Sequence, residues 1–409
     1  MTTTYGAELA SSPVAGVSAT ADLSREKTAN TQSPATDAPP FRFYDNRQKY
    51  LAFVNTCNEK ATVAARVAQE LKQLHPSPPA LRIFDAGMGD ATVLSRLMRS
   101  THGIFRTVPL LVVAKEISLE DVRLGLEKMP DRFYEHPHTV LVITNLNYAE
   151  APRLMPQDVT AAAALNWQTV RLTGNSAHEY EEQIEALGPA LSHGWQTKPS
   201  AKTGNPVYAR PTVLVIYRED HKFLLDNVIP KPGQTLGNYD LILASQPWRA
   251  RTSAKFKAQR ILAPLARSLA PGGRMVTVQS YGEDPPLEII QKLWPGETPF
   301  QVNRHELLKA LKTELGHDAR DYTLAAPPDD KSLFRYQMHT LPSEIGERVG
   351  TSTLFAAWNA AIYVNQIADE MLDSVVTTGA YLDATQAVLQ KHGGLWFNDE
   401  SFVVSRRRN

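Results

Sequence analysis

The apolar residues of this chain switch repeatedly between the spacing of a strand and the spacing of a helix. Short apolar runs at 81–84, 108–114 and 139–144 have the pattern of buried strands, and helical patterns at 91–99 and 119–129 separate them. Strands that alternate with helices in this way pair in parallel, because each helix carries the chain back across a face of the sheet. The sequence therefore predicts an α/β, doubly wound, mostly parallel sheet with helices on both faces.

The alternation stops for about 90 residues and then resumes. Polar and Pro/Gly-rich stretches surround one strong strand pattern at 212–217, which predicts an insertion. Strand, helix and strand patterns return at 239–244, 254–268 and 274–278. The expected segments are a disordered tail (1–40), an N-terminal helical lid (41–79), the first half of the core (80–149), a substrate-shaping insertion (150–236), the second half of the core (237–280), and C-terminal helices with closing strands (281–409).

Composition narrows the class of protein further. The 43 Lys and Arg residues balance 43 Asp and Glu residues, so the surface as a whole is not a polyanion-binding field. The single cysteine, Cys57, excludes a disulfide framework and a multi-cysteine metal site. No apolar run reaches the roughly 20 residues of a membrane span, and residues 1–40 lack the pattern of a signal peptide. We therefore expect a cytoplasmic protein with no membrane partner.

A glycine-containing loop follows the first predicted strand. Its sequence at 85–89 is Asp-Ala-Gly-Met-Gly, and it leads directly into a helix. At the carboxyl end of a parallel strand, glycines let the backbone approach a ligand, and the helix start offers free N–H groups. The next strand ends at Glu116, a carboxylate that can accept hydrogen bonds from two ribose hydroxyls. Thr92 replaces the third glycine of a nicotinamide-binding loop, which favours a different nucleoside cofactor.

With these motifs the chain resembles the class I S-adenosylmethionine-dependent methyltransferases. In that family the first strand ends in D-x-G-x-G, an acid ends the second strand, and a later turn carries P-G-G. Here the same order holds at 85–89, Glu116 and 271–273. The resemblance covers about residues 80–145 and 237–280, and it implies a seven-stranded sheet, to which the insertion and the C-terminal helices are added.

The resemblance also implies a cofactor, S-adenosylmethionine, and residues that bind it. These residues are Asp85, Gly87, Gly89, Glu116, Asn145 and Ser245. The two glycines would cradle the methionine end, the aspartate would orient it, the glutamate would hold the ribose, and the asparagine would lie near the adenine. Ala91 departs from the family, which often has a third glycine there.

The loop after the fourth core strand is the expected edge of the acceptor pocket. Its sequence, Ser245-Gln246-Pro247-Trp248, loosely resembles the N/D/S-P-P-Y/F/W motif of methyltransferases that act on planar amino nitrogens. In that motif the aromatic ring stacks on the acceptor, so Trp248 is a predicted catalytic-site residue. Gln246 replaces the first proline of the motif. An ordinary turn with a half-buried tryptophan is the alternative interpretation.

Methyl transfer depends on alignment and exclusion of water, and a base is needed only where the acceptor must lose a proton. The predicted candidates are Tyr44, Tyr50, Lys115 or a residue of the insertion. Both tyrosines belong to the polar and aromatic segment 43–50, which precedes the core. Family members often use such a segment as a lid over the cofactor, and an ordinary amphipathic entry helix is the alternative.

The sequence thus predicts a methyltransferase of a small-molecule acceptor on nitrogen, sulfur or oxygen, with a thiol or an amine favoured. Neutral charge and the lack of a recognisable RNA-binding appendage favour a small acceptor over a nucleic acid. One alternative is a protein or RNA methyltransferase that docks its substrate through Arg249, Arg251, Lys255 and Lys257. A nucleotide-binding oxidoreductase and a non-catalytic nucleotide-binding module are the others.

Two further features of the sequence do not predict a functional site. His136 and His138 form an H-x-H pair without a third ligand at matching spacing, so no metal is expected. The apolar helix expected at 353–372 could belong to the core or to a homodimer interface.

Overall fold

The computed structural model describes residues 47–200, 206–324, 326–340, 342–346 and 349–408. The predicted tail at 1–40 and the candidate base Tyr44 lie outside these residues. Within the described ranges, every helix is too short or too polar to cross a membrane.

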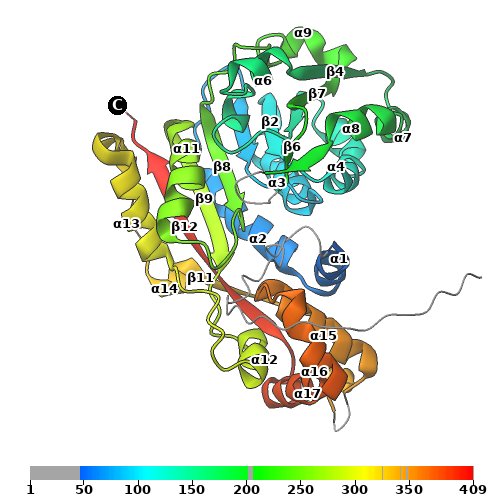
Figure 1. Cartoon of the computed structure of the whole chain (residues 1–409). Helices are drawn as coiled ribbons and strands as arrows, with labels where there is room; N and C mark the ends of the chain where they lie inside the picture. The colour runs from blue at the N-terminus through cyan, green and yellow to red at the C-terminus, as the bar shows by residue number, and fades with distance from the viewer. Residues whose placement is uncertain (1–46, 201–205, 325, 341, 347–348, 409) are drawn as a thin grey trace, which may run out of the picture. The chain divides into compact units, whose positions relative to one another are not determined.

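Most of the strands join one sheet (Figure 1). Along the chain the strands are β1 (Leu81–Asp85), β2 (Leu110–Lys115), β3 (Thr139–Thr144), β4 (Asn166–Leu172), β5 (Thr197–Pro199), β6 (Pro206–Tyr208), β7 (Thr212–Arg218), β8 (Tyr239–Ser245), β9 (Leu269–Ser280), β10 (Tyr322–Thr323), β11 (Leu333–Gln337) and β12 (Trp396–Arg406). The sheet order is β10-β12-β9-β8-β1-β2-β3-β7-β4, and β11 also pairs with β12. The central strands β9, β8, β1, β2 and β3 are parallel, which confirms the doubly wound α/β fold.

The sheet is wider than the seven strands expected, because ten strands join it among the described residues. The insertion supplies two of them. β7 is buried along its whole length and pairs antiparallel with β3, and β4 then pairs parallel with β7. These strands satisfy the backbone groups that would otherwise be exposed at the β3 edge. β5 and β6 form a separate two-stranded sheet.

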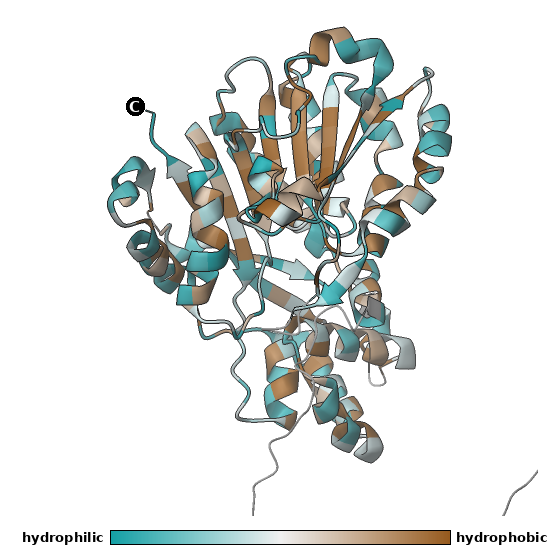
Figure 2. Cartoon of the chain, turned by 45° about the horizontal axis from the view of Figure 1, so that its top comes forward, coloured by the Kyte–Doolittle hydropathy of each residue, from teal (hydrophilic) through white to brown (hydrophobic). Residues whose placement is uncertain are grey.

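Helices cover both faces of the sheet, as predicted. Ile83 and Val112 point to one face and Phe84 and Val113 to the other, since successive side chains alternate along a strand. On the first face lie α2 (Glu59–Ala68), α3 (Thr92–Ile104), α4 (Leu119–Leu126), α5 (Pro130–Glu135), α7 (Ala177–Glu185) and α8 (Gly188–Gly194). On the second face lie α9 (Lys222–Leu225), α10 (Ala254–Lys257), α11 (Ala263–Arg267) and α13 (Arg304–Leu315). Figure 2 shows the apolar strands between these helices.

The helix expected at 254–268 is divided by a π-helical turn, Ala258–Leu262, between α10 and α11. Pro264 lies in the first turn of α11 and has no N–H to continue the regular hydrogen-bond ladder. The short helices α6 (Val159–Ala163) and α14 (Asp329–Ser332) complete the connections.

A third apolar cluster lies beside the sheet, where Phe53, Trp358 and Phe397 are buried. Its helices are α1 (Arg47–Thr56), α12 (Pro285–Leu293), α15 (Thr351–Val364), α16 (Leu372–Thr378) and α17 (Ala380–His392). Figure 1 shows α12, α15, α16 and α17 at the bottom of the view and α1 above α15, with β12 running from this group into the sheet. The helix expected at 353–372 ends earlier, at Val364, and Gln366 then adopts a left-handed conformation with φ +51°.

Candidate active site

The order of the strands reverses at β1. The chain places β2 and β3 on one side of β1 and later places β8 and β9 on the other side. In an open parallel sheet the loops diverge at such a point and leave a crevice outside the carboxyl ends of the strands. Here Asp85 ends β1 and Ser245 ends β8. A Cβ atom on Gly87 would lie 4.0 Å from the Ser245 carbonyl oxygen, so the two loops are neighbours.

The loop after β1 needs glycine at one position. Gly89 has φ +52°, and a Cβ atom there would lie 3.1 Å from the Tyr50 hydroxyl. Ala91 has φ +58° and is fully buried. The left-handed conformation is unfavourable for alanine. The departure from a third glycine at Ala91 therefore carries a conformational cost, which the sequence alone did not reveal.

The Glu116 carboxylate, 7% exposed, joins this loop to the end of β2. Its Oε2 accepts a hydrogen bond from Gly89 N at 2.8 Å, and its Oε1 accepts from Ile117 N at 2.7 Å and Ser118 N at 2.9 Å. A carboxylate has about four acceptor positions, so a further donor can still approach Oε2. The acid predicted to hold a ribose thus also shapes the glycine loop.

Asp85 is 1% exposed at the end of β1. Its Oδ1 accepts a hydrogen bond from Gly87 N at 3.1 Å. Burial raises the pKa of Asp85 to about 7, and Glu116 adds to the rise, whereas the Gly87 N–H and the Lys60 ammonium oppose it.

Tyr50 of α1 lies beside the glycine loop, and Lys60 of α2 lies beside Tyr50. The Tyr50 hydroxyl lies 3.5 Å from Asp90 Oδ1, and Lys60 Nζ lies 5.5 Å from the centre of the Tyr50 ring. Lys60 Nζ is also 3.3 Å from Glu59 Oε2. Burial raises the pKa of Tyr50 above its usual value, although Lys60 opposes this rise. The phenol therefore stays protonated, which favours positioning over the predicted role of a base.

Tyr148 contacts the ends of both β2 and β8. Its hydroxyl donates to the Pro247 carbonyl oxygen at 2.9 Å, and Lys115 Nζ lies 4.8 Å from the centre of its ring. Burial lowers the pKa of Lys115, with Glu116 opposing the change. A lowered pKa makes a lysine a better proton acceptor near neutral pH, so Lys115 stays a candidate base.

The turn after β8 is held by an unexpected partner. Gln246 has φ +48°, and its Nε2 donates to Ser280 Oγ at 3.1 Å and lies 3.4 Å from both carboxyl oxygens of Asp399. Asp399 is fully buried and pairs with Ser280 in the sheet. Because β12 runs antiparallel to β9, its first residues reach the edge where the parallel strands end.

Trp248 is half-buried in the same turn. Its Nε1 donates to Gln279 Oε1 at 3.0 Å, and Lys257 Nζ lies 5.2 Å from the centre of its ring. These residues line a cavity of about 10 Å³ together with Gln246 and Ser280, which is space for one water molecule. Stacking of Trp248 on an acceptor stays a prediction.

Asn145 has a structural role inside the protein. It is 2% exposed, its Nδ2 donates to the carbonyl oxygens of Gly194 and Arg210, and its Oδ1 accepts from Thr212 N at 2.8 Å. Both donors of the amide are therefore used by the insertion, and a contact with adenine stays a prediction. The insertion also reaches the end of β2, where Trp195 Nε1 donates to the Glu116 carbonyl oxygen at 2.8 Å.

The basic segment after β8 is partly directed inward. Lys257 is 1% exposed and donates to the Ala250 carbonyl oxygen at 3.1 Å. Arg251 donates to two carbonyl oxygens that follow α15 and pairs with Glu297. Of the four residues predicted as a docking patch, Lys257 is therefore not available to a macromolecular surface, and Arg251 is already engaged, while Lys255 is exposed.

The two histidines of the H-x-H pair lie at the other edge of the sheet. His136 Nδ1 lies 2.9 Å from His102 Nδ1, and its Nε2 lies 2.9 Å from the Val108 carbonyl oxygen. Across the described part of the chain, no three His, Cys, Asp or Glu side chains gather in a geometry that could hold a metal ion. Burial raises the pKa of Cys57 to about 12, which disfavours a nucleophilic thiolate.

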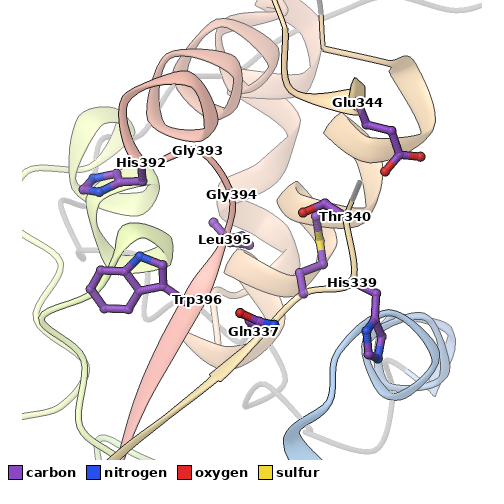
Figure 3. A pocket seen from close by; sticks show the side chains of 10 residues that line it. Gln337, His339, Thr340, Glu344, His392, Gly393, Gly394, Leu395 and Trp396 are labelled. Atoms are coloured by element: carbon purple, nitrogen blue, oxygen red, sulfur yellow. The ribbon is translucent and has the colours of Figure 1, made fainter. Parts of the chain in front are cut away.

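A larger cavity, of about 610 Å³, lies where β11 ends and β12 begins (Figure 3). His339, Glu344, His392 and Trp396 are among the residues that line it. His392 Nε2 is 2.8 Å from Glu288 Oε2. None of the predicted site residues lines this cavity.

No protein-family model and no curated protein matches the chain. Solved structures resemble it at low identity. Geranyl diphosphate methyltransferase in complex with GPP and sinefungin is 14% identical, with a TM-score of 0.29 over 84% of this chain and 78% of that chain. The rRNA methyltransferase aviRa from Streptomyces viridochromogenes is 14% identical, with a TM-score of 0.22 over 54% of this chain and 73% of that one. PKMT2 from Rickettsia typhi in complex with AdoHcy is 11% identical, with a TM-score of 0.26 over 85% and 53%.

Two of these three structures are named as methyltransferases, the class that the sequence motifs resemble. Likenesses this distant fix no substrate, so the function of the chain has to be inferred from its own residues.

Sequence reasoning missed three groups at this edge of the sheet. Tyr148 carried a weak signal, because it is an aromatic residue just past a core strand. No sequence signal indicated that Lys60 or Asp399 belongs to this site. The packing of α2 positions Lys60, and the antiparallel pairing of β12 positions Asp399.

Proposed function

We propose that this chain is an S-adenosylmethionine-dependent methyltransferase that acts on a small-molecule acceptor through nitrogen, sulfur or oxygen. The observation that carries the proposal is the glycine loop at the switch point, where Gly89 N donates to the Glu116 carboxylate beside the buried Asp85. When bound, the cofactor supplies an electrophilic methyl group on a positively charged sulfur.

The residues of the crevice fit such a cofactor. Gly87 and Gly89 have no side chains to obstruct a ligand at these two positions, Glu116 keeps an acceptor position for a hydroxyl, and Asp85 offers a carboxyl group to a cation. We also propose that α1 covers the cofactor, since the Tyr50 hydroxyl lies over the glycine loop. The insertion would shape the acceptor side, as its contact with the end of β2 suggests.

Binding of S-adenosylhomocysteine, measured by calorimetry, tests the cofactor. We expect Glu116→Ala to weaken binding at least about tenfold, since it removes a charged acceptor. Glu127→Ala is the matched control, because Glu127 is an exposed glutamate at the end of α4. Equal affinity of the parent and of Glu116→Ala would contradict the assignment.

Transfer of a labelled methyl group tests the reaction and the acceptor. The protein is incubated with methyl-labelled S-adenosylmethionine and a cell extract, and the label is separated by size, with heat-inactivated protein as the control. Label in small molecules supports the proposal, whereas label in protein or RNA favours the alternative. The inward position of Lys257 argues against a wide basic docking surface. A homodimer and a cytoplasmic location stay predictions from the sequence.

A further inference from the structure

The indole ring of Trp248 is oriented by one polar contact. Its Nε1 donates a hydrogen bond to Gln279 Oε1 at 3.0 Å, and an indole has no other N–H donor. The ring is half-buried and packs against the apolar cluster on the second face of the sheet, with Lys257 Nζ 5.2 Å from its centre. Trp248 follows the carboxyl end of β8, at the edge of the sheet that carries the proposed crevice.

The side-chain amide of Gln279 has only one orientation that satisfies its partners. Its Nε2 donates to the Val302 carbonyl oxygen and to Glu400 Oε1, both at 2.7 Å, while its Oε1 accepts from Trp248. An amide turned by half a rotation would set a donor against a donor at the indole and an oxygen against an oxygen at the other two contacts. Gln279 is 4% exposed, so the lost bonds would leave buried polar atoms without partners. The position of the oxygen that accepts from the indole is therefore fixed.

Glu400, which is 1% exposed, holds this amide in place. Its Oε2 lies 3.1 Å from Nη1 of Arg304, in the first turn of α13. Arg304 also donates to the Pro327 carbonyl oxygen and pairs with Asp329. The polar contacts therefore run without a break from α13 through β12 and β9 to the turn after β8. A buried polar chain whose members are all bonded keeps its side chains in one arrangement.

The backbone of the turn after β8 is held by other residues. The Pro247 carbonyl oxygen accepts from the Tyr148 hydroxyl at 2.9 Å, and Ala250 N donates to Gln366 Oε1 at 3.0 Å. Neither bond involves Gln279. The contact that Gln279 makes with this turn is to the indole ring, so its effect is on the orientation of the ring rather than on the path of the backbone.

We propose that Gln279 is a positioning residue of the methyl-acceptor site, which acts through Trp248 by fixing the plane of the indole ring against which the acceptor lies. This inference rests on the proposed function, because it takes Trp248 as a wall of the acceptor pocket. The acceptor must meet the methyl group in line, and a small error in its placement lowers the rate strongly. A ring that could rotate would hold the acceptor in several orientations. Gln279 therefore raises the rate of transfer without touching the acceptor.

Nuclear magnetic resonance of the chain with isotopically labelled tryptophan tests the hydrogen bond without any ligand. The chain has six tryptophans, so the indole signal that is missing from Trp248→Phe belongs to Trp248. We expect Gln279→Met to shift this signal upfield and to speed the exchange of its hydrogen with solvent by up to about tenfold, because the hydrogen bond is lost. The signals of the other tryptophans should stay in place.

Transfer of a labelled methyl group tests the consequence for the reaction. The rate is measured against the amount of cell extract, which separates the maximal rate from the apparent KM for the acceptor. Gln279→Met should lower the maximal rate by about tenfold or more, and it should leave the affinity for S-adenosylhomocysteine unchanged.

Gln183→Met is the matched control. The Gln183 amide also donates to two carbonyl oxygens, of Thr173 and Glu179, and accepts from Thr173 N. None of these partners belongs to the turn after β8, so this variant should transfer the label at the rate of the parent.

The double variant Trp248→Phe with Gln279→Met separates positioning from a general structural role. Phenylalanine has no N–H for Gln279 to orient, so Trp248→Phe should lower the maximal rate about as much as Gln279→Met. The double variant should then be no slower than either single variant. If Gln279→Met lowers the rate by the same factor in the parent and in the Trp248→Phe chain, its effect belongs to the fold and the proposal is wrong.

The remaining outcomes separate this inference from the proposed function. An unchanged Trp248 indole signal in Gln279→Met, or transfer by Trp248→Phe at the rate of the parent, would overturn the positioning role and leave the cofactor assignment intact. If the parent transfers no label to any fraction, the positioning role fails, and calorimetry of S-adenosylhomocysteine then shows whether the cofactor assignment fails too. Because Trp248→Phe leaves Gln279 in place, a Gln279→Met chain that does not fold still leaves a decisive measurement.

Discussion

Replacement of Glu116 by glutamine changes one oxygen of a buried carboxylate into an amide nitrogen and leaves the shape of the side chain intact. In the parent chain the two oxygens accept three backbone hydrogen bonds, from Gly89, Ile117 and Ser118. The glutamine oxygen can keep the two bonds made at Oε1. The amide nitrogen must then face Gly89 N, a donor against a donor, so the bond that holds the glycine loop is lost.

The magnitude follows from these three bonds. A hydrogen bond to a charged group contributes about 1.5–3 kcal/mol, and a neutral acceptor makes bonds roughly half as strong. Losing one bond and halving the strength of two predicts a decrease of ~3–6 kcal/mol in the free energy of unfolding. The same change removes the negative charge expected to hold a ribose, so the affinity for S-adenosylhomocysteine should fall by about tenfold or more.

Urea denaturation followed by circular dichroism measures the first effect, and calorimetry measures the second. Glu127→Gln makes the same chemical change at an exposed position of α4 and should alter the free energy of unfolding by less than about 0.5 kcal/mol. If Glu116→Gln is as stable as this control, the three hydrogen bonds do not hold the loop and the reasoning is wrong.

Three other predictions address the loop, the core and the amino edge of the sheet. Gly89→Ala should cost ~1–2 kcal/mol, because alanine is unfavourable at φ +52° and its Cβ would lie 3.1 Å from the Tyr50 hydroxyl; adding Tyr50→Phe should recover the steric part in urea denaturation. Glu400→Gln should cost ~3 kcal/mol in the same assay, because Glu400 and Arg304 form a buried ion pair, with Oε2 and Nη1 3.1 Å apart. Burial lowers the pKa of His136 from 6.5 to about 4, so the stability that it contributes is complete above pH 6.5 and should decrease by ~2 kcal/mol as the pH falls towards 4, after allowance for partial solvent access.

Each of these predictions has an outcome that would contradict it. If Gly89→Ala has the same free energy of unfolding as the parent chain, the residue at this position does not adopt a left-handed conformation. A cost below about 1 kcal/mol for Glu400→Gln would mean that Arg304 has other sufficient partners. For His136, the control is His136→Gln, whose unfolding free energy should vary less between pH 6.5 and 4 than that of the parent; equal curves would assign the acid sensitivity to other groups.

The alternation of strand and helix patterns determined the doubly wound core, because it depends only on local periodicity and on the need to bury apolar faces. The same local information located the glycine loop at 85–89 and Glu116 at the ends of neighbouring strands, since parallel strands end at one edge. Such features are written in consecutive residues and need no knowledge of distant contacts.

The tertiary structure decided what no local pattern contains. It paired β7 antiparallel with β3, and β4 with β7, so that two segments of the insertion extend the main sheet. These strands supply hydrogen-bond partners to the backbone groups at the β3 edge. It also brought Asp399 beside Gln246, 153 positions apart in sequence. The same packing places the Lys60 ammonium where its charge acts on the buried carboxyl groups of Asp85 and Asp399. Burial and charge at these points depend on the packing of several elements at once, and their physical chemistry therefore belongs to the fold rather than to any one segment of the chain.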